Sequence, residues 1–226
     1  MKWLREYIKK NPGNFSLLFR IWNIVFSRSR IRGRSGNKIR IGVSMLKRVR
    51  IEIQGTGNEI IIGDLCQLVG LRITISGNNN KIEIGNRCVM LGNEMNLEHD
   101  NNRIIVGDNV YIQVETNFSL MEGTSLTVGS DCMIAGWAHI RTSDAHPIFD
   151  TDGVRLNPAR NVIIGSHVWI ALRTTILKGT TVAEGCLVGA CALLNSEYTE
   201  PNCIIVGNPA KVVRQNIRWE RDLSKR

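Results

Sequence analysis

A motif that returns four times with little change decides the fold: NKIRIG at 37–42, NEIIIG at 58–63, NKIEIG at 80–85 and NRIIVG at 102–107. A related segment, TSLTVG, follows at 124–129. The closing glycines return at an almost constant spacing. The stretches between the motifs are rich in Asn and Gly, which tolerate the positive φ angles of tight corners. One strand-rich coil per repeat, stacked on the next, predicts a parallel β-solenoid.

A shorter period lies inside the longer one. From Ile164 to Leu194 an aliphatic residue returns at every sixth position. Four positions after the aliphatic residue of each repeat stands a small or β-branched side chain, and these positions are Cys66, Cys88, Val110, Cys132, Val168, Thr174, Thr180, Cys186 and Ala192. Because Cys alternates there with Val, Thr and Ala, packing in a reduced interior explains four of the six cysteines better than disulfides or metal ligands do.

This pattern resembles the hexapeptide-repeat acyltransferases. The resemblance covers about residues 36–214 and is strongest in VIIGSHVWIALRTTILKGTTVAEGCLVGA, at 162–190, and in IIVGNPAKVVR, at 204–214. It implies a left-handed parallel β-helix of triangular cross-section with three hexapeptides per turn, which we expect over 36–213. The longer coils marked by the closing glycines would then contain three hexapeptides plus a short corner loop.

The strict repeat is interrupted once, between Gly129 and Gly165, by the segment RTSDAHPIFDTDGVRLNPARN at 141–161. A loop so rich in His, Asp, Arg and Pro is unusual for a corner that serves packing alone, and we expect the active site there. The segment is similar to the His-Pro loop that supplies the catalytic base in the family's sugar O-acetyltransferases. The resemblance therefore implies His146, followed by Pro147, as the base.

The chemistry agrees with that role. Transfer of an acetyl group from a thioester to a hydroxyl requires removal of the hydroxyl proton as attack begins, and a neutral imidazole is a suitable general base near pH 7. Asp144, two residues before His146, is expected either to orient the imidazole by accepting its other N–H or to contact the acceptor. A polar residue about two coils earlier contacts the acceptor in relatives, and Asn117 or Glu115 is the nearest match.

The resemblance also implies a binding site for acetyl-CoA. Trp169 stands where relatives have the Trp that lines the channel between acetyl-CoA and the acceptor. Ala171 replaces the usual Gly two residues later, and Ala190 matches the CoA-contacting VIGAGS run, which is VGACAL here. Lys211 and Arg214, in the intact GNPAKVVR segment, match the cations near the CoA phosphates.

The N-terminal quarter is strongly basic. Residues 1–50 hold 14 Lys or Arg and one acid, Glu6, so they carry +13, and the remaining residues carry −4 of the total of +9. We expect an amphipathic helical segment over 1–35, with Trp3, Leu4, Tyr7 and Ile8 on an apolar face and a polar stripe at Ser16, Arg20, Asn23 and Ser27. This segment is interpreted either as a cap on the open end of the solenoid or as an anchor on an anionic membrane surface. We also expect a helical tail over 214–226.

The function expected is acetyl-CoA-dependent O-acetylation of a sugar in a bacterial capsule or O-antigen. The alternative is N-acetylation of an amino sugar linked to a nucleotide. A metal-dependent anhydrase of the same family needs three histidine ligands, and among four histidines only His146 has supporting context, so no metal is expected. The expected partners are two further copies in a homotrimer, a glycan acceptor and the inner face of the membrane, but no nucleic acid. The expected location is the cytoplasm, since no signal peptide or spanning segment is evident.

Overall fold

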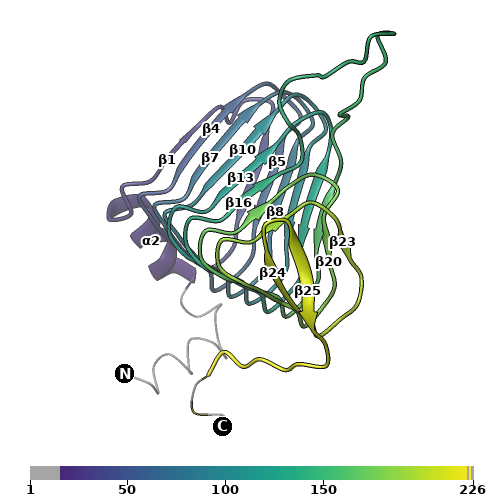
Figure 1. Cartoon of the computed structure of the whole chain (residues 1–226). Helices are drawn as coiled ribbons and strands as arrows, with labels where there is room; N and C mark the ends of the chain where they lie inside the picture. Colours follow the sequence, from purple (N-terminus) through teal and green to yellow (C-terminus); the bar gives the residue numbers. More distant parts are fainter. Residues whose placement is uncertain (1–15, 223, 225–226) are drawn as a thin grey trace.

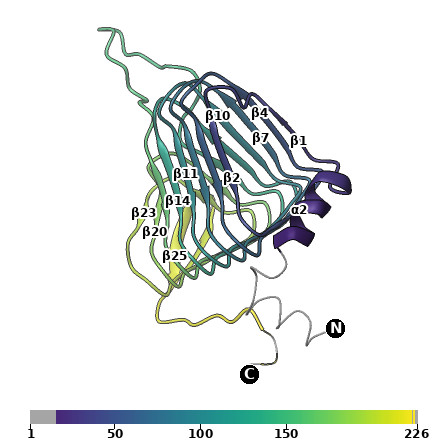
Figure 2. The same cartoon turned by 180° about the vertical axis from the view of Figure 1, so that it is seen from behind.

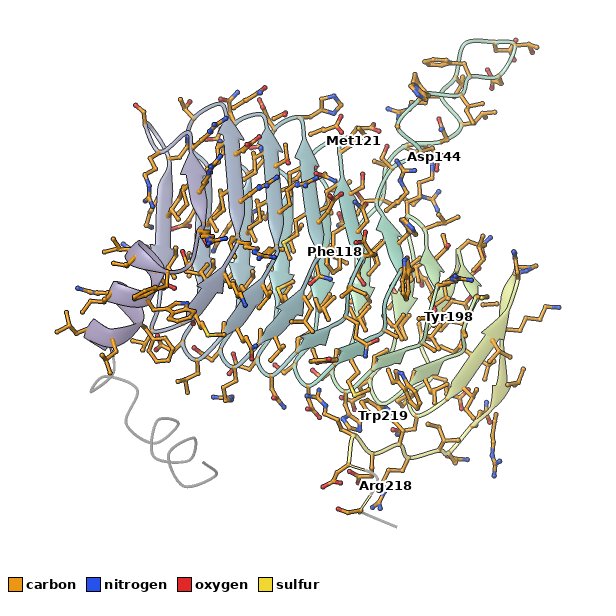
Figure 3. The ribbon with its side chains drawn as sticks, turned by 90° about the vertical axis from the view of Figure 1, so that its left-hand side faces the viewer. Phe118, Met121, Asp144, Tyr198, Arg218 and Trp219 are labelled. Atoms are coloured by element: carbon orange, nitrogen blue, oxygen red, sulfur yellow. The ribbon has the colours of Figure 1, made fainter. Side chains whose placement is uncertain are left out.

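A computed structural model describes residues 16–222 and 224, and these form a three-sided parallel β-helix of about eight coils (Figures 1 and 2). Each coil contributes one strand to each of three flat sheets, which we name A, B and C in chain order. In Figure 3 the coils stack from the N-terminal end, where α2 lies, to the C-terminal strands. The predicted parallel β-helix is confirmed.

Sheets A and B each contain eight parallel strands within the described residues. Sheet A consists of β1 (Arg30–Arg32), β4 (Arg50–Gln54), β7 (Arg72–Ser76), β10 (Glu94–Glu98), β13 (Asn117–Leu120), β16 (His139–Arg141), β19 (Thr175–Ile176) and β22 (Leu193–Leu194). Sheet B consists of β2 (Lys38–Ile41), β5 (Glu59–Ile62), β8 (Lys81–Ile84), β11 (Arg103–Val106), β14 (Ser125–Val128), β17 (Val162–Ile164), β20 (Thr181–Val182) and β23 (Glu197–Tyr198).

Sheet C ends on an antiparallel strand. Its members are β3 (Met45–Lys47), β6 (Gln67–Val69), β9 (Val89–Leu91), β12 (Tyr111–Ile112), β15 (Met133–Ile134), β18 (Trp169–Ile170), β21 (Leu187–Val188), β24 (Ile204–Gly207) and β25 (Ala210–Arg214). Only the last pair, β24 and β25, runs antiparallel. The family's GNPAK segment thus forms the turn and the final strand of this sheet.

Strand register explains the two coil lengths. In the early coils Ile60 pairs with Ile82, whereas in the later, shorter coils Trp169 pairs with Leu187. The additional residues of the long coils lie between sheets A and B, at a corner that we call the A–B corner. The coil that contains residues 141–161 is longer still, since Ile140 pairs with Ile176. The predicted insertion therefore enlarges a corner that is already extended in the earlier coils.

The core is a column of inward-facing side chains from all three sheets. Ile51, Ile73 and Ile82 are among the many aliphatic residues that are fully buried. Every residue of the small or β-branched position predicted from sequence is buried, and all six cysteines are free thiols. The Sγ of Cys66 lies 3.0 Å from the Gly85 carbonyl oxygen, and burial raises the pKa of Cys132 to about 11. The packing interpretation of the four cysteines is confirmed.

A ladder of buried asparagines closes the A–B corner. Asn58, Asn80 and Asn102 occupy equivalent positions in successive coils, and each backbone N–H donates to the Oδ1 of the asparagine one coil earlier, at 2.8 Å. The ladder starts at Asn37 and ends where Thr124 N donates to Asn102 Oδ1. Positive φ angles occur instead at their neighbours Asn79 and Asn101 and at several glycines of the same corner. The first Asn of each repeat thus satisfies buried backbone groups rather than making the turn.

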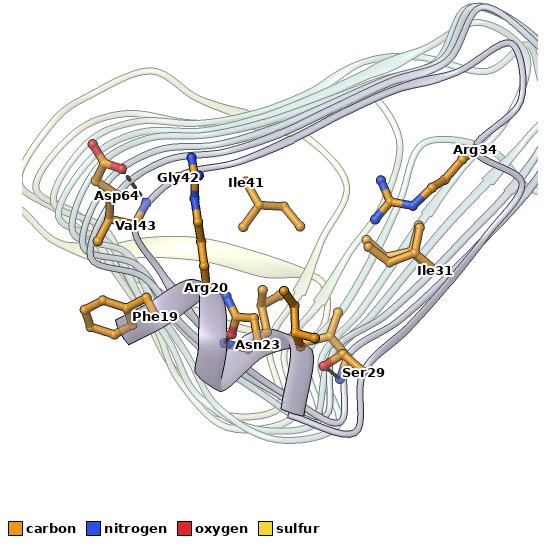
Figure 4. Close-up of a pocket in the computed structure, with 14 residues that line it drawn as sticks. Phe19, Arg20, Asn23, Ser29, Ile31, Arg34, Ile41, Gly42, Val43 and Asp64 are labelled. Atoms are coloured by element: carbon orange, nitrogen blue, oxygen red, sulfur yellow. Dashed lines mark hydrogen bonds between the residues drawn. The ribbon is translucent and has the colours of Figure 1, made fainter. Parts of the chain in front are cut away.

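The helix α2 (Ser16–Val25) covers the exposed edge of the first coil through its polar side. Asn23 donates to Ser44 O and accepts from Leu46 N, and Trp22 Nε1 donates to Leu46 O. The backbone N–H and C=O groups of an edge strand lack a neighbouring strand to bond to, and here α2 supplies the partners for those of Leu46 in β3. Arg20 and Asn23 also line a cavity of about 550 Å³ between α2 and the first coil (Figure 4). Helix α2 thus contacts the first coil at the end of the solenoid where a cap was predicted, while the predicted apolar face at Trp3, Leu4, Tyr7 and Ile8 lies outside the described residues.

Of the segment predicted to be helical over 1–35, the structure describes residues 16–35, and only Ser16–Val25 are helical there. Helix α2 ends at Val25, and β1 begins at Arg30, where Arg30 to Arg32 pair with Arg50 to Glu52 of β4. The first coil therefore starts before residue 36, because this pairing supplies β4 with a neighbouring strand.

The predicted C-terminal helix is wrong for the described part of the tail. Residues 215–222 contain no helix, and Asn216 has a positive φ. Two residues at a spacing of two contact the solenoid: Trp219 Nε1 donates to His167 O, and Arg221 donates to the carbonyl oxygens of Asp131 and Cys132. Alternate residues point to the same side of an extended chain but not of a helix, so the contacts of both Trp219 and Arg221 agree with an extended tail. Within the described residues no helix is long and apolar enough to cross a membrane.

Candidate active site

The loop that carries His146 extends away from the solenoid between β16 and β17 (Figure 1). Its distal part is a small hairpin in which Phe149 bridges Arg155 and Asp150 N donates to Val154 O. The Asp150 carboxylate accepts from the backbone N–H groups of Asp152 and Val154, which holds the turn. Four apolar side chains of this arm are more than half exposed: Ile148, Phe149, Val154 and Leu156. Exposed apolar groups concentrated on one arm are typical of a surface that contacts another molecule.

The preceding coil holds one side of the loop base through Glu122. Its carboxylate receives two hydrogen bonds from the Arg155 guanidinium, with atoms 2.6 and 3.0 Å apart, and a third from Ser143 Oγ at 2.7 Å. A bidentate Arg–carboxylate pair of this kind fixes orientation as well as distance. The hydrogen bonds from Arg155 and then from Ser143 lower the pKa of Glu122, so the pair remains charged around neutral pH.

The following coil holds the other side through Lys178. Its ammonium group lies 2.5 Å from Asp144 Oδ2 and lowers the pKa of that carboxyl. The buried Asn157 side chain donates to Asp144 Oδ2 and to the His146 carbonyl oxygen, each at 2.9 Å, and accepts from Ile148 N at 2.6 Å. The backbone on both sides of His146 is thereby tied to one asparagine.

A cavity of about 350 Å³ lies at this base and is lined by Asp144, Leu156, Asn157, Pro158, Arg160, Leu177, Lys178 and Asn195. It is polar and carries two cations, Lys178 and Arg160. Asp144, which the sequence places near the acceptor, thus faces a small polar space at the foot of the loop.

The His146 imidazole is exposed and makes no hydrogen bond or ion pair with any part of the chain that the structure describes. Its backbone N–H donates to Asp144 O at 2.8 Å, but the Asp144 carboxylate binds Lys178 and Asn157 rather than the ring. Asp144 is therefore linked to His146 only through Asn157 and the backbone. A ring nitrogen without a protein partner is free to accept a proton from a bound hydroxyl.

The residues expected to contact acetyl-CoA lie on sheet C and on the corner between sheets C and A, the C–A corner. Trp169 in β18 faces outward, and its ring lies 5.9 Å from that of Trp219. Ala171 follows β18 directly, and Ala190, which is exposed, is the second residue after β21. The sequence did not predict that Trp219 would lie beside Trp169, at the corner between sheets B and C, where it stacks on the His167 ring at 4.1 Å.

Lys211 and Arg214 lie on β25, the edge of sheet C, where both side chains are exposed. Neither forms an ion pair within the described residues, so both cations remain available to an anionic group. Asn117 begins β13 on sheet A and faces outward beside His139, its partner in register.

One chain does not bring the expected catalytic and cofactor residues together. In Figure 3 Asp144, at the base of the loop, and Trp219, the neighbour of Trp169, lie at opposite edges of the solenoid. The loop rises from the A–B corner, whereas Ala171 and Ala190 follow strands of sheet C. A strand of sheet A therefore separates the two corners within each coil.

Other groups important to the site were not evident from sequence. Four of them hold the base of the loop. Glu122 lies in the coil before the loop, Arg155 and Asn157 lie in the loop, and Lys178 lies in the coil after it, so no local sequence pattern joins them. His167, which stands at a variable repeat position, has its Nδ1 2.7 Å from Asp131 Oδ2 and anchors the tail. No group of three or more His, Cys, Asp or Glu side chains suited to a metal ion occurs in the described ranges.

The chain is similar in sequence and in structure to known acetyltransferases. No protein-family model matches the chain. The crystal structure of the polysialic acid O-acetyltransferase OatWY aligns with 86% of this chain and 92% of its own, with a TM-score of 0.74 and 30% identity. The polysialic acid O-acetyltransferases of Escherichia coli O1:K1 and Neisseria meningitidis are 37% and 34% identical over 98 and 106 residues. These two matches cover 43% and 46% of this chain but only 32% and 49% of the relatives' lengths.

A three-sided parallel β-helix built from six-residue repeats defines a hexapeptide-repeat protein. The sequence identity of 30% over nearly the whole OatWY structure adds a relationship in sequence to the likeness in fold. The chain belongs to the hexapeptide-repeat acyltransferase family.

Proposed function

We propose that the protein transfers an acetyl group from acetyl-CoA to a sugar hydroxyl of a bacterial surface polysaccharide, a capsule or an O-antigen, with His146 as general base. The observation that carries the proposal is the free, exposed imidazole on the one loop that interrupts the repeat. Relatives named as polysialic acid O-acetyltransferases support the acceptor class.

In this mechanism His146 accepts the hydroxyl proton through a ring nitrogen as the sugar oxygen attacks the acetyl carbonyl carbon. The same proton then passes to the departing sulfur, so the imidazole returns to its neutral state and an ester and a free thiol are formed. Asn157 holds the backbone of His146 in place, and the charged groups Glu122 and Lys178 hold the loop base. Such prior positioning reduces the entropy lost on reaching the reactive geometry.

The residues on the C–A corner and on β25 fit a long, flexible thioester with phosphates at one end. Trp169 offers an aromatic surface to the pantetheine arm, and the backbone near Ala171 and Ala190 runs along the corner. Lys211 and Arg214 supply positive charge for the phosphates, and neither has an acidic partner within the described part of the chain. We assign Asp144 and Asn117 to the acceptor.

We further propose that the active site is shared between copies in a homotrimer. The loop and the cofactor residues lie at different corners of one chain, and the arm beyond His146 exposes four apolar side chains. Docking this arm on sheet C of a neighbouring copy would bury those side chains and bring His146 to Trp169. A cyclic arrangement repeats this contact at each interface.

The first test is a transfer assay. Purified protein is incubated with acetyl-CoA and a panel of bacterial glycans that includes polysialic acid, and products are analysed by mass spectrometry. The proposal expects an acetylated glycan whose acetyl group is removed by mild base, as esters are. An acetyl group that resists mild base would indicate an amide, and thus the N-acetyltransferase alternative. Acetylation of none of the glycans would contradict the proposal.

We also propose a cytoplasmic protein with peripheral contact at an anionic membrane. Five large apolar residues of α2 and the following turn are more than 60% exposed: Leu17, Leu18, Ile24, Val25 and Phe26. Exposed arginines Arg28 and Arg30 stand beside them. Apolar side chains flanked by cations are typical of segments that lie at the surface of anionic bilayers.

Sedimentation with vesicles tests this contact. The protein is expected to sediment with vesicles that contain phosphatidylserine and much less with pure phosphatidylcholine. The double variant I24E/F26E should lose the binding, because charge opposes burial in lipid. The control is Ile163→Glu, which changes an exposed isoleucine of sheet B, far from α2. Equal sedimentation of wild type and I24E/F26E would refute the membrane proposal.

A further inference from the structure

The C–A corner requires a residue with positive φ in most coils, and one of these residues is a tryptophan. The equivalent residues are Arg48, Gly70, Gly92, Glu115, Trp137, Arg173 and Cys191. Glycine adopts this conformation without strain, whereas a bulky residue at φ +57 is unusual and costs energy. The Trp137 side chain is 45% exposed, so burial does not offset that cost. A large aromatic side chain left exposed at a position that glycine fills in other coils points to a binding role.

Arg173 stands one coil above Trp137 and covers part of its ring. Its backbone N–H donates to Gly136 O at 3.1 Å, and its guanidinium carbon lies 5.9 Å from the ring centroid. An exposed cation–π contact at this distance contributes little to stability. Arg173 is itself exposed and has no carboxylate partner in the described residues. The pair therefore presents an aromatic face and an unpaired guanidinium to the solvent.

The surroundings add apolar and hydrogen-bonding groups. Val114 and Leu172, on the same corner, are about two-fifths exposed. Asn117, His139 and Thr175 lie side by side at the adjoining ends of β13, β16 and β19. An aromatic plane with a few polar side chains at its edge suits a pyranose, whose C–H face is apolar and whose hydroxyls need partners. A guanidinium beside it suits a carboxylate.

The position of the pair also agrees with the cofactor site proposed above. Ala171 and Ala190 follow on the same corner toward the C-terminus, and Cys191, next to Ala190, is in register with Arg173. Adjacent coils are about 4.8 Å apart, so Trp137 lies within a few such steps of Ala190. With CoA phosphates at Lys211 and Arg214, the thioester end points toward Trp137.

We propose that Trp137 and Arg173 form an acceptor subsite, in which the indole stacks on a sugar ring and the guanidinium binds the carboxylate of an acidic sugar. This subsite rests on the proposed function. It assigns to the chain a preference for acidic glycans, and it gives a reason for an exposed tryptophan at this corner.

Variants of the same corner test the subsite. Trp137→Gly removes the ring and suits the backbone, as Gly70 and Gly92 show, so it should fold at least as well as the wild type. With polysialic acid as acceptor, Trp137→Gly is expected to raise KM for the glycan about tenfold or more, while KM for acetyl-CoA and kcat change little. Trp137→Phe should retain most of the affinity. The control is Arg48→Gly, which removes a charge from the same corner four coils earlier. It should leave KM for the glycan unchanged.

Arg173→Gln separates charge from stacking. It should weaken use of polysialic acid but not of the same polymer after reduction of its carboxyl groups. Direct glycan binding, measured by calorimetry, distinguishes the two proposals. If the wild type binds polysialic acid through Trp137 without acetylating any glycan, the subsite stands and the proposed function fails. If Trp137→Gly binds and uses the polymer as the wild type does, the subsite is refuted.

Discussion

Replacement of His146 by Ala is expected to lower the rate of acetyl transfer about 10²- to 10⁴-fold, which is the usual contribution of a general base. The loss should fall on kcat, since the base acts on the proton in the transition state rather than on the binding of either substrate. The imidazole is exposed and makes no hydrogen bond or ion pair with the described part of the chain, so the variant should fold and melt as the wild type does. Steady-state kinetics with a glycan found in the panel would measure the effect.

His99→Asn is the matched control. His99 is an exposed histidine with positive φ at the A–B corner, where Asn79 and Asn101 show that asparagine is accepted. This variant removes an imidazole of similar exposure from the same side of the molecule and should keep the wild-type rate. If His146→Ala transferred acetyl groups as fast as His99→Asn, His146 would not be the base.

The repeat could be predicted from sequence because each coil uses the same inward positions. Aliphatic residues at a spacing of six, and Cys, Val, Thr or Ala four positions later, are set by the interior of a narrow three-sided prism. The same regularity located the one loop that departs from it. The ladder of Asn58, Asn80 and Asn102 could not be predicted in this way, because asparagine serves both in turns and in buried hydrogen bonds, and only burial separates the two roles.

The chain ends were predicted less well. An amphipathic pattern shows that a helix has two faces but not which face contacts the protein. In α2 the polar face is the docked one, since Asn23 and Trp22 satisfy edge groups of β3. The tail after β25 was expected to be helical, yet contacts of Trp219 and Arg221 with a distant part of the chain select an extended path.

The support of the His146 loop could not be predicted at all. The pairs Glu122–Arg155 and Asp144–Lys178 join residues that are 33 and 34 positions apart. They meet only because the enlarged coil returns to the same corner, which depends on the register of the whole solenoid. The sequence named the base and the cofactor residues by resemblance, while the structure shows that they occupy different corners of one chain.

The central claim, an acetyltransferase with an active site assembled between copies, can be tested by mixing two inactive variants. His146→Ala lacks the base and Trp169→Ala lacks the aromatic wall of the acetyl-CoA channel, and each alone should be nearly inactive. The two variants are co-expressed with different affinity tags, and only mixed oligomers are purified through both tags in turn. In a mixed cyclic trimer one interface pairs an intact His146 with an intact Trp169, so about one third of the wild-type rate should return. Mixed oligomers no more active than either variant alone would contradict a shared site.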